Sequence, residues 1–141
     1  MRLRTIGFAL ILGCLSVGTM ACTTASTASI PQREMPAGAS FSGLWYTNFG
    51  DMTLTQKMDG YTRGTFEFKG EGQVEGQVQG GVFIFDWMQP GDFQIGRREV
   101  KGKGYLVISD DGLSMTGQWG YGDSYTGGGE WTGNKATEIY R

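Results

Sequence analysis

The sequence contains no histidine and only two cysteines, Cys14 and Cys22, which both lie within its first 22 residues. Without histidine, the usual base that activates a serine or cysteine nucleophile is missing, and so is a common nitrogen ligand of zinc. The chain beyond Cys22 has no thiol and can form no internal disulfide. These absences exclude the usual nucleophile–base pairs and most zinc sites. We predict no catalytic residue, no cofactor and no bound metal.

The sequence also lacks an excess of charge of either sign, and it lacks helical periodicity. Twelve Lys and Arg residues nearly balance fourteen Asp and Glu residues, which gives a formal net charge of −2. Such a mild charge gives no reason to expect nucleic acid as a partner. Beyond Cys22 no stretch shows the apolar spacing of a helix, so a phosphate loop between a strand and a helix is not expected. The length of 141 residues suits one domain.

The first 21 residues have the pattern of an export signal. Two arginines precede the apolar segment 6–18, which is shorter than the ~20 residues of a membrane-spanning helix. The ending TMAC, with Ala21 before Cys22, resembles a bacterial lipobox, in which the cysteine is lipidated and becomes the new N-terminus. Thr19 replaces the usual leucine, and together with Ala21 it also suits ordinary signal peptidase. We expect lipidation at Cys22, with plain secretion as the alternative.

The residues after the signal predict where the protein is held. Thr23, and not aspartate, follows Cys22, which by resemblance to Gram-negative lipoprotein sorting predicts an outer membrane lipoprotein facing the periplasm or the cell surface. The membrane is then a partner through the N-terminal lipid. The next residues are small, polar and interrupted by prolines, so they bury little apolar area. We expect a signal peptide over 1–21, a lipidated N-terminus with a flexible tether over 22–40, and a barrel domain over 41–141.

Beyond residue 40 the apolar residues recur at every second position, which is the pattern of half-buried strands. Turn signals such as Asp59-Gly60 and Asp111-Gly112 separate the runs. Every connection can be a hairpin, and closing the sheet removes its two exposed edges. The sequence therefore predicts an all-β fold, an eight-stranded antiparallel up-and-down meander barrel. We expect its strands over about 41–48, 52–57, 61–69, 73–79, 82–88, 104–109, 113–121 and 131–139.

The same alternation predicts which side chains face the barrel interior. An eight-stranded barrel is either filled by side chains or just wide enough for one small ligand, and the apolar set here is large enough to fill it. Asp86, within the apolar run VFIFDWM, is expected to point outward because its aromatic neighbours make the better inner face. The expected inner face consists of Trp45, Met52, Leu54, Phe66, Phe68, Val74, Val78, Phe83, Phe85, Trp87, Leu113, Met115, Trp119 and Trp131.

The segment GLWYTNFGDMTLTQKMDGYTRGTF, residues 43–66, resembles the first three strands of avidin and streptavidin. The shared features are Gly-x-Trp at the start, a glycine turn, and Gly-Thr followed by an aromatic residue. The resemblance implies an avidin-like or lipocalin-like barrel of the calycin type. It does not carry the biotin contacts, because Thr47, Asp51 and Phe66 stand where the family has Asn, Ser and Tyr. The whole domain looks more like small Gly-Trp-rich secreted bacterial barrels without an assigned activity.

The predicted strand directions bring the long connections together at one end of the barrel. These are the segments 49–51, 70–72, 89–103 and 122–130, and function tends to lie on loops of this kind. Basic residues and tyrosines in them suit an anionic ligand, a glycan, a lipid headgroup or a protein, although a solvated loop has the same composition. The predicted ligand- or partner-binding residues are Asn48, Asp51, Trp87, Arg97, Arg98, Tyr121 and Tyr125.

Two functions remain open from the sequence. The first is a lipid-anchored, non-enzymatic envelope module that binds an unknown small ligand, glycan or protein at the mouth. The second is a structural or inhibitory envelope protein whose solid barrel acts through protein–protein contacts. A cavity of roughly 300 Å³ or more beneath the mouth favours a small-molecule ligand. A hydrolase, the weakest class, needs two carboxylates that converge in a cleft, with Asp86 as one of them.

Overall fold

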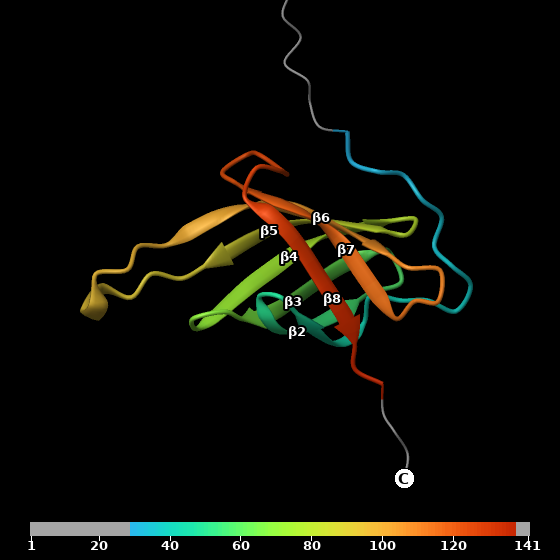
Figure 1. The fold of residues 1–141 in the computed structure, drawn as a ribbon, viewed down its shortest axis with the longest axis horizontal. Helices are drawn as coiled ribbons and strands as arrows, with labels where there is room; N and C mark the ends of the chain where they lie inside the picture. Colours follow the sequence, from blue (N-terminus) through green and yellow to red (C-terminus); the bar gives the residue numbers. More distant parts are fainter. Residues whose placement is uncertain (1–28, 138–141) are drawn as a thin grey trace, which may run out of the picture.

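The computed structural model describes residues 29–137, which form a closed eight-stranded barrel (Figure 1). Each strand pairs antiparallel with the next along the chain, and β1 closes the barrel against β8. The prediction of an all-β meander barrel is confirmed, and the architecture is consistent with a calycin-like fold. The strands are β1 (Gly43–Thr47), β2 (Gly50–Gln56), β3 (Tyr61–Glu67), β4 (Glu71–Gln79), β5 (Val82–Gln89), β6 (Val100–Ile108), β7 (Ser114–Tyr121) and β8 (Gly129–Lys135).

Some of the sequence predictions fall on parts of the chain outside the described residues. These are the signal peptide, the lipidation site Cys22 and the last residues of the predicted eighth strand. Within residues 29–137 the helical structure is limited to one 3₁₀ turn, η1 (Phe93–Ile95), which lies in the β5–β6 connection.

The barrel interior is filled mainly by the side chains that the alternation predicts. Trp45, Met52 and Phe83 are fully buried, while Phe68, Val78 and Trp119 are partly buried against the same core. Leu113 is the exception: its side chain is 45% exposed, so the prediction that it faces inward is wrong. It precedes β7 and belongs to a turn in which its N–H donates to the Asp111 carboxylate. The core also contains Phe41, Leu106 and Ile108, which the sequence patterns did not assign to it.

Glycines facing the interior make room for the large aromatic rings. A Cβ atom on Gly72 would lie 2.2 Å from the ring of Phe66, and one on Gly104 would lie 2.6 Å from the ring of Phe85. Each glycine therefore gives up its own side-chain volume to a ring from a neighbouring strand. A barrel this narrow holds its aromatic core only because glycine and aromatic residues alternate across adjacent strands.

The described part of the expected tether lies against the barrel. We call residues 31–41 the N-terminal strap; it runs along the end opposite the long loops (Figure 1). The Gly81 N–H donates to the Arg33 carbonyl at 2.8 Å, and the Arg33 side chain forms an ion pair with Asp110. Met35 packs against the core, and Phe41 is fully buried. These contacts differ from the free spacer expected over 22–40, because a few apolar residues within a polar segment are enough to anchor it.

The β5–β6 connection is a projecting hairpin, which we call the arm (residues 89–100). In Figure 1 this connection extends away from the barrel. The pairing of β5 with β6 continues out to Gln89 and Val100, and a further isolated bridge joins Asp92 to Arg97. Residues 100–103 are therefore strand, although the sequence assigned them to a long loop over 89–103. The run VKGKG hides this strand because its inward positions are held by glycines and its outward ones by lysines.

Candidate functional site

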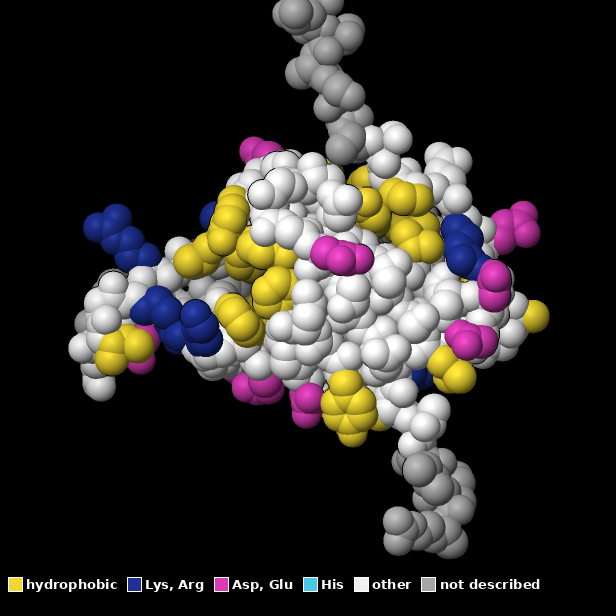
Figure 2. Space-filling model, viewed as in Figure 1, with side chains coloured by type: hydrophobic (Ala, Val, Ile, Leu, Met, Phe, Trp, Pro, Cys, Tyr) yellow, Lys and Arg dark blue, Asp and Glu magenta, His cyan; other side chains and the backbone are white. Residues whose placement is uncertain are grey.

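The longer connections and the arm lie at one end of the barrel, which we call the mouth. Hydrophobic side chains gather there on the surface between the arm and the β7–β8 loop (Figure 2). They come from the β1–β2 turn, from the ends of β3, β5 and β7, and from the start of β8. We refer to six of them as the mouth cluster: Phe49, Phe68, Trp87, Trp119, Tyr121 and Trp131.

Phe49 is the centre of the mouth cluster. Its ring centroid lies 5.2 Å from that of Phe68, 5.6 Å from that of Trp119 and 5.1 Å from that of Trp131, always edge to face. Tyr121 extends the cluster outward, 5.0 Å from Trp119, and its side chain is 59% exposed. Edge-to-face contacts of this kind are favourable beyond the area that they bury. The result is a rigid aromatic wall with one tyrosine at its lip.

A small apolar cleft opens within this wall. Its volume is about 140 Å³, and its lining is completed by Phe66 and, at the base of the arm, by Gln89 and Val100. The volume is well below the roughly 300 Å³ of small-molecule sites. An apolar cavity of about 150 Å³ is known to hold one benzene ring. Trp131 packs edge to face with Phe66 and Phe85 at the floor of the cleft. These rings fill the barrel interior there, so the cleft does not extend into it. The cleft therefore suits one ring-sized group and not a whole small-molecule ligand inside the barrel.

Two indole N–H groups of the mouth cluster are buried without an acceptor among the described residues. They belong to Trp119 and Trp131. The other two tryptophans are satisfied, because Trp87 donates to the Gly120 carbonyl at 3.1 Å and Trp45 donates to the Phe41 carbonyl at 2.8 Å. An unpaired buried donor costs about 1–3 kcal/mol. Among the described residues, the mouth thus contains two buried donors without an acceptor, whereas the Trp45 indole at the opposite end is paired.

Two of the predicted site residues meet in the cleft, a third ties two elements of the fold together, and a fourth is exposed on the outer face. Trp87 and Tyr121 line the cleft together. The Asn48 side chain donates to the Glu130 carbonyl at 2.9 Å and accepts from the Thr132 N–H at 2.9 Å, which ties the β1–β2 turn to β8. Asp51 is exposed on the outer face of β2, opposite Tyr46 of β1. The amide of Asn48 is therefore already engaged by the backbone.

The basic residues and Tyr125 do not form one patch with the aromatic wall. The Arg97 guanidinium reaches back to donate to the Lys69 carbonyl, which ties the arm to the β3–β4 turn. Arg98 is exposed on the arm. Tyr125 lies over the outer face of β6, where the Lys103 ammonium is 5.7 Å from its ring centroid. The structure therefore divides the predicted site between the mouth, the arm and the outer surface.

Sequence reasoning placed Phe49 at the mouth through the segment 49–51, but it missed how Phe68, Trp119 and Trp131 contribute there. Phe68, Trp119 and Trp131 were assigned to the core, because alternation predicts the inward face and not the depth along the barrel axis. Phe49 carried a usable signal. A large aromatic residue in the turn NFGD is unusual where small polar residues are the rule.

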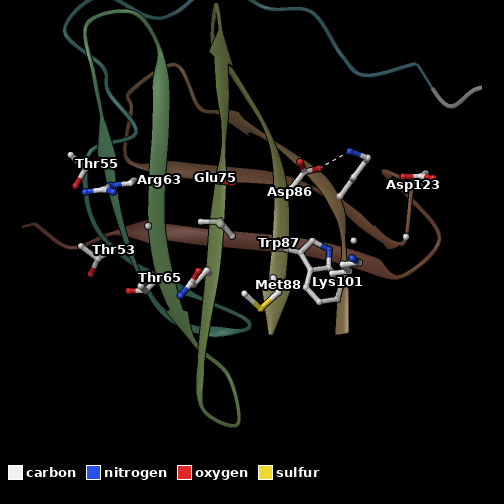
Figure 3. A pocket seen from close by; sticks show the side chains of 16 residues that line it. Thr53, Thr55, Arg63, Thr65, Glu75, Asp86, Trp87, Met88, Lys101 and Asp123 are labelled. Atoms are coloured by element: carbon white, nitrogen blue, oxygen red, sulfur yellow. Dashed lines mark hydrogen bonds and ion pairs between the residues drawn. The ribbon is translucent and has the colours of Figure 1, made fainter. Parts of the chain in front are cut away.

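A second and larger hollow lies on the outer face of β2–β6, away from the aromatic wall, and Figure 3 shows the side chains that line it. Its volume is about 890 Å³. Strand register sets its side chains in two rows across the sheet. The charged row consists of Thr55, Arg63, Glu75, Asp86 and Lys103, and the neutral row of Thr53, Thr65, Gln73 and Met88, ending at Lys101. We call this hollow the outer groove.

Asp86 faces outward into the outer groove, as its sequence context predicted. Its side chain is 64% exposed and accepts a hydrogen bond of 2.7 Å from the Lys103 ammonium. This hydrogen bond raises the pKa of Lys103. The residue directly opposite Asp86 on β4 is Glu75, which accepts from the Tyr61 hydroxyl at 3.0 Å. Two carboxylates thus stand side by side on an open sheet face, each with its own donor, and not in an enclosed cleft.

Comparisons with protein-family models, with curated proteins and with solved structures find no match to this chain. Among residues 29–137, no three His, Cys, Asp or Glu side chains are grouped as a metal ion would require. None of the helical structure in that part of the chain has the length and hydropathy of a membrane span.

Proposed function

We propose that this chain is a non-enzymatic, lipid-anchored binding module of the bacterial envelope. In this proposal the mouth holds one ring-sized apolar group of a larger partner, either a glycan or a protein. The observation that carries the proposal is the aromatic cleft of about 140 Å³ with the exposed Tyr121 at its lip. A cleft of this size takes one ring, so the rest of the partner must lie outside it.

The sequence supports the remaining parts of the proposal. The lipobox-like ending at Cys22 supports a lipid anchor, and Thr23 after it supports the outer membrane. The segment 43–66 supports an avidin-like barrel, with the mouth at the same end as its long loops. An anchored barrel gains from binding at a fixed aromatic wall, because rigid rings lose little conformational entropy when they bind.

A second candidate function rests on the filled interior. Trp131, Phe66 and Phe85 pack edge to face across the barrel, as in a solid structural domain. A structural or inhibitory envelope protein would act through its outer surface and would not need the cleft. The two candidates differ in whether the mouth accepts a ring-sized group.

The test titrates the folded protein with phenol and with cyclohexanol while the indole N–H signals are followed by NMR. We expect the signals of Trp119 and Trp131 to shift at about millimolar concentrations, as suits a single ring. Tyr121→Ala should weaken this binding by removing the lip of the cleft. Tyr46→Ala is the matched control, because Tyr46 is 55% exposed on the outer face of β1. Unmoved mouth indoles with both probes would favour the structural candidate.

A further inference from the structure

The outer groove is a candidate for a second binding site, separate from the mouth. It crosses the outer faces of β2–β6, and its volume of about 890 Å³ compares with about 140 Å³ for the cleft. The hollow is open along the sheet face, so a ligand would lie along it and would not be enclosed. Trp87 belongs to the lining of both hollows, and its indole packs with Trp119 and Tyr121 on the mouth side. The outer groove therefore accommodates an extended ligand, whereas the cleft accommodates one ring.

The charges along the outer groove cancel one another. Arg63, Lys101 and Lys103 are balanced by Glu75, Asp86 and Asp123 within the same lining. In the charged row the cations stand at the outside and the carboxylates at the centre, and the Lys103–Asp86 ion pair closes one side. A lining without net charge offers little attraction to an anionic or a cationic polymer. Recognition here must therefore depend on hydrogen bonds.

The neutral row supplies those hydrogen-bonding groups. The hydroxyls of Thr53 and Thr65 and the amide of Gln73 stand next to each other in register on β2, β3 and β4. Among residues 29–137 these three side chains have no hydrogen-bond partner in the protein, unlike Asp86 and Glu75 nearby. Each hydroxyl both donates and accepts, and the amide does the same through two atoms. The row thus presents three neighbouring groups that can each donate and accept, together with the apolar surface of Met88.

We propose that the outer groove binds an uncharged glycan chain of several sugar units. A sugar chain presents hydroxyls that donate and accept, which matches the neutral row, and its C–H faces suit the apolar surface of Met88. An anionic polymer would meet the two central carboxylates. An apolar peptide would leave the threonine and glutamine groups unpaired, which costs binding energy. The neutral glycan is the chemistry that meets the hydroxyl and amide groups of the neutral row without bringing net charge to a lining whose charges sum to zero.

The experiment uses three neutral hexasaccharides, namely chitohexaose, cellohexaose and maltohexaose, followed by backbone NMR and calorimetry. We expect at least one of them to bind and to perturb amides of β2–β6. We expect the double variant Thr53→Val, Thr65→Val to bind about tenfold more weakly, because two hydrogen bonds are lost while shape and strand propensity are kept. Thr116→Val is the matched control, since Thr116 is an exposed threonine on β7 outside the lining.

Further measurements separate this proposal from its rivals and from the mouth. Salt at about 0.5 M should leave the hexasaccharide affinity unchanged, because no net charge is involved. Tyr121→Ala should also leave it unchanged, so that a failure of the mouth proposal does not affect this one. The proposal is overturned if no neutral hexasaccharide perturbs the groove amides at about 10 mM, which is weaker than any useful affinity. It is equally overturned if only anionic hexagalacturonate binds there and salt abolishes that binding.

Discussion

The two ends of the barrel are built from the same eight strands, but one end is covered by the chain and the other is open. At one end the N-terminal strap covers the opening, Phe41 is fully buried, and Trp45 donates to the Phe41 carbonyl. At the mouth, rings of similar size remain partly exposed, and the indoles of Trp119 and Trp131 have no acceptor within residues 29–137. The difference shows that aromatic residues only pack the core at the closed end, while at the mouth they form a partly exposed surface that a ligand can contact.

The largest expected effect is a loss of stability on substitution at the closed end. Phe41→Ala should lower the free energy of unfolding by about 3–5 kcal/mol, because it empties a fully buried ring position beneath the strap. Tyr121→Ala at the mouth should cost less than about 1 kcal/mol, because that ring is more than half exposed. Urea unfolding followed by circular dichroism measures both. Equal losses for the two variants would mean that the mouth is as structural as the closed end.

An intermediate effect sharpens the comparison between two buried tryptophans. Trp45→Phe removes a donor and leaves the Phe41 carbonyl without that bond, whereas Trp131→Phe removes a donor that has no acceptor in the described part of the chain. Both variants lose similar ring volume from sites that are at most 2% exposed. We expect Trp45→Phe to cost about 1–3 kcal/mol more than Trp131→Phe. Thermal unfolding of the two variants decides this, and a larger loss for Trp131→Phe would show that its N–H is satisfied in solution.

The smallest effect concerns pH at the closed end. The Ser109 hydroxyl donates to Asp111 at 2.6 Å and the Leu113 N–H donates at 2.9 Å, and these bonds lower the pKa of Asp111 from 3.8. Because the folded pKa lies below the unfolded one, this contribution is complete above pH 3.8 and is lost as the pH falls through the folded pKa. Unfolding curves between neutral pH and about pH 3 should therefore fall less steeply for Asp111→Asn. Ser109→Ala removes the larger cause and should reproduce part of the change. Parallel curves for the variants and the parent protein would contradict this assignment.

Much of the fold could be predicted because its signal is local. Alternation placed Phe83, Phe85 and Trp87 inside and Asp86 outside, as the structure has them. The same logic failed for Leu113, where a turn ends the alternation before the strand begins. It also failed for residues 100–103, where glycines on the inner face removed the apolar half of the pattern. Alternation is a reliable guide only where both faces carry side chains.

The candidate sites were harder to predict, because they depend on which strands meet. The threonines of the neutral row are unremarkable one by one in the sequence, and they become a surface only through the register of β2, β3 and β4. The mouth cluster likewise collects rings from turns and strand ends that are far apart in the chain. Register and depth along the barrel axis are long-range properties, so periodicity within one strand cannot express them.

The sequence by itself determined that the chain makes antiparallel strands, where most of them turn, and which residues face inward, because these follow from a two-residue period and local turn chemistry. Only the tertiary structure decided that the polar N-terminal strap packs against the closed end of the barrel. It also decided that the indoles of Trp119 and Trp131 at the mouth have no acceptor among the described residues. It alone also decided that charges from separate strands cancel across the outer groove. These features arise when strands distant in the chain are brought into one register, and each depends on neighbours that no local stretch of sequence contains.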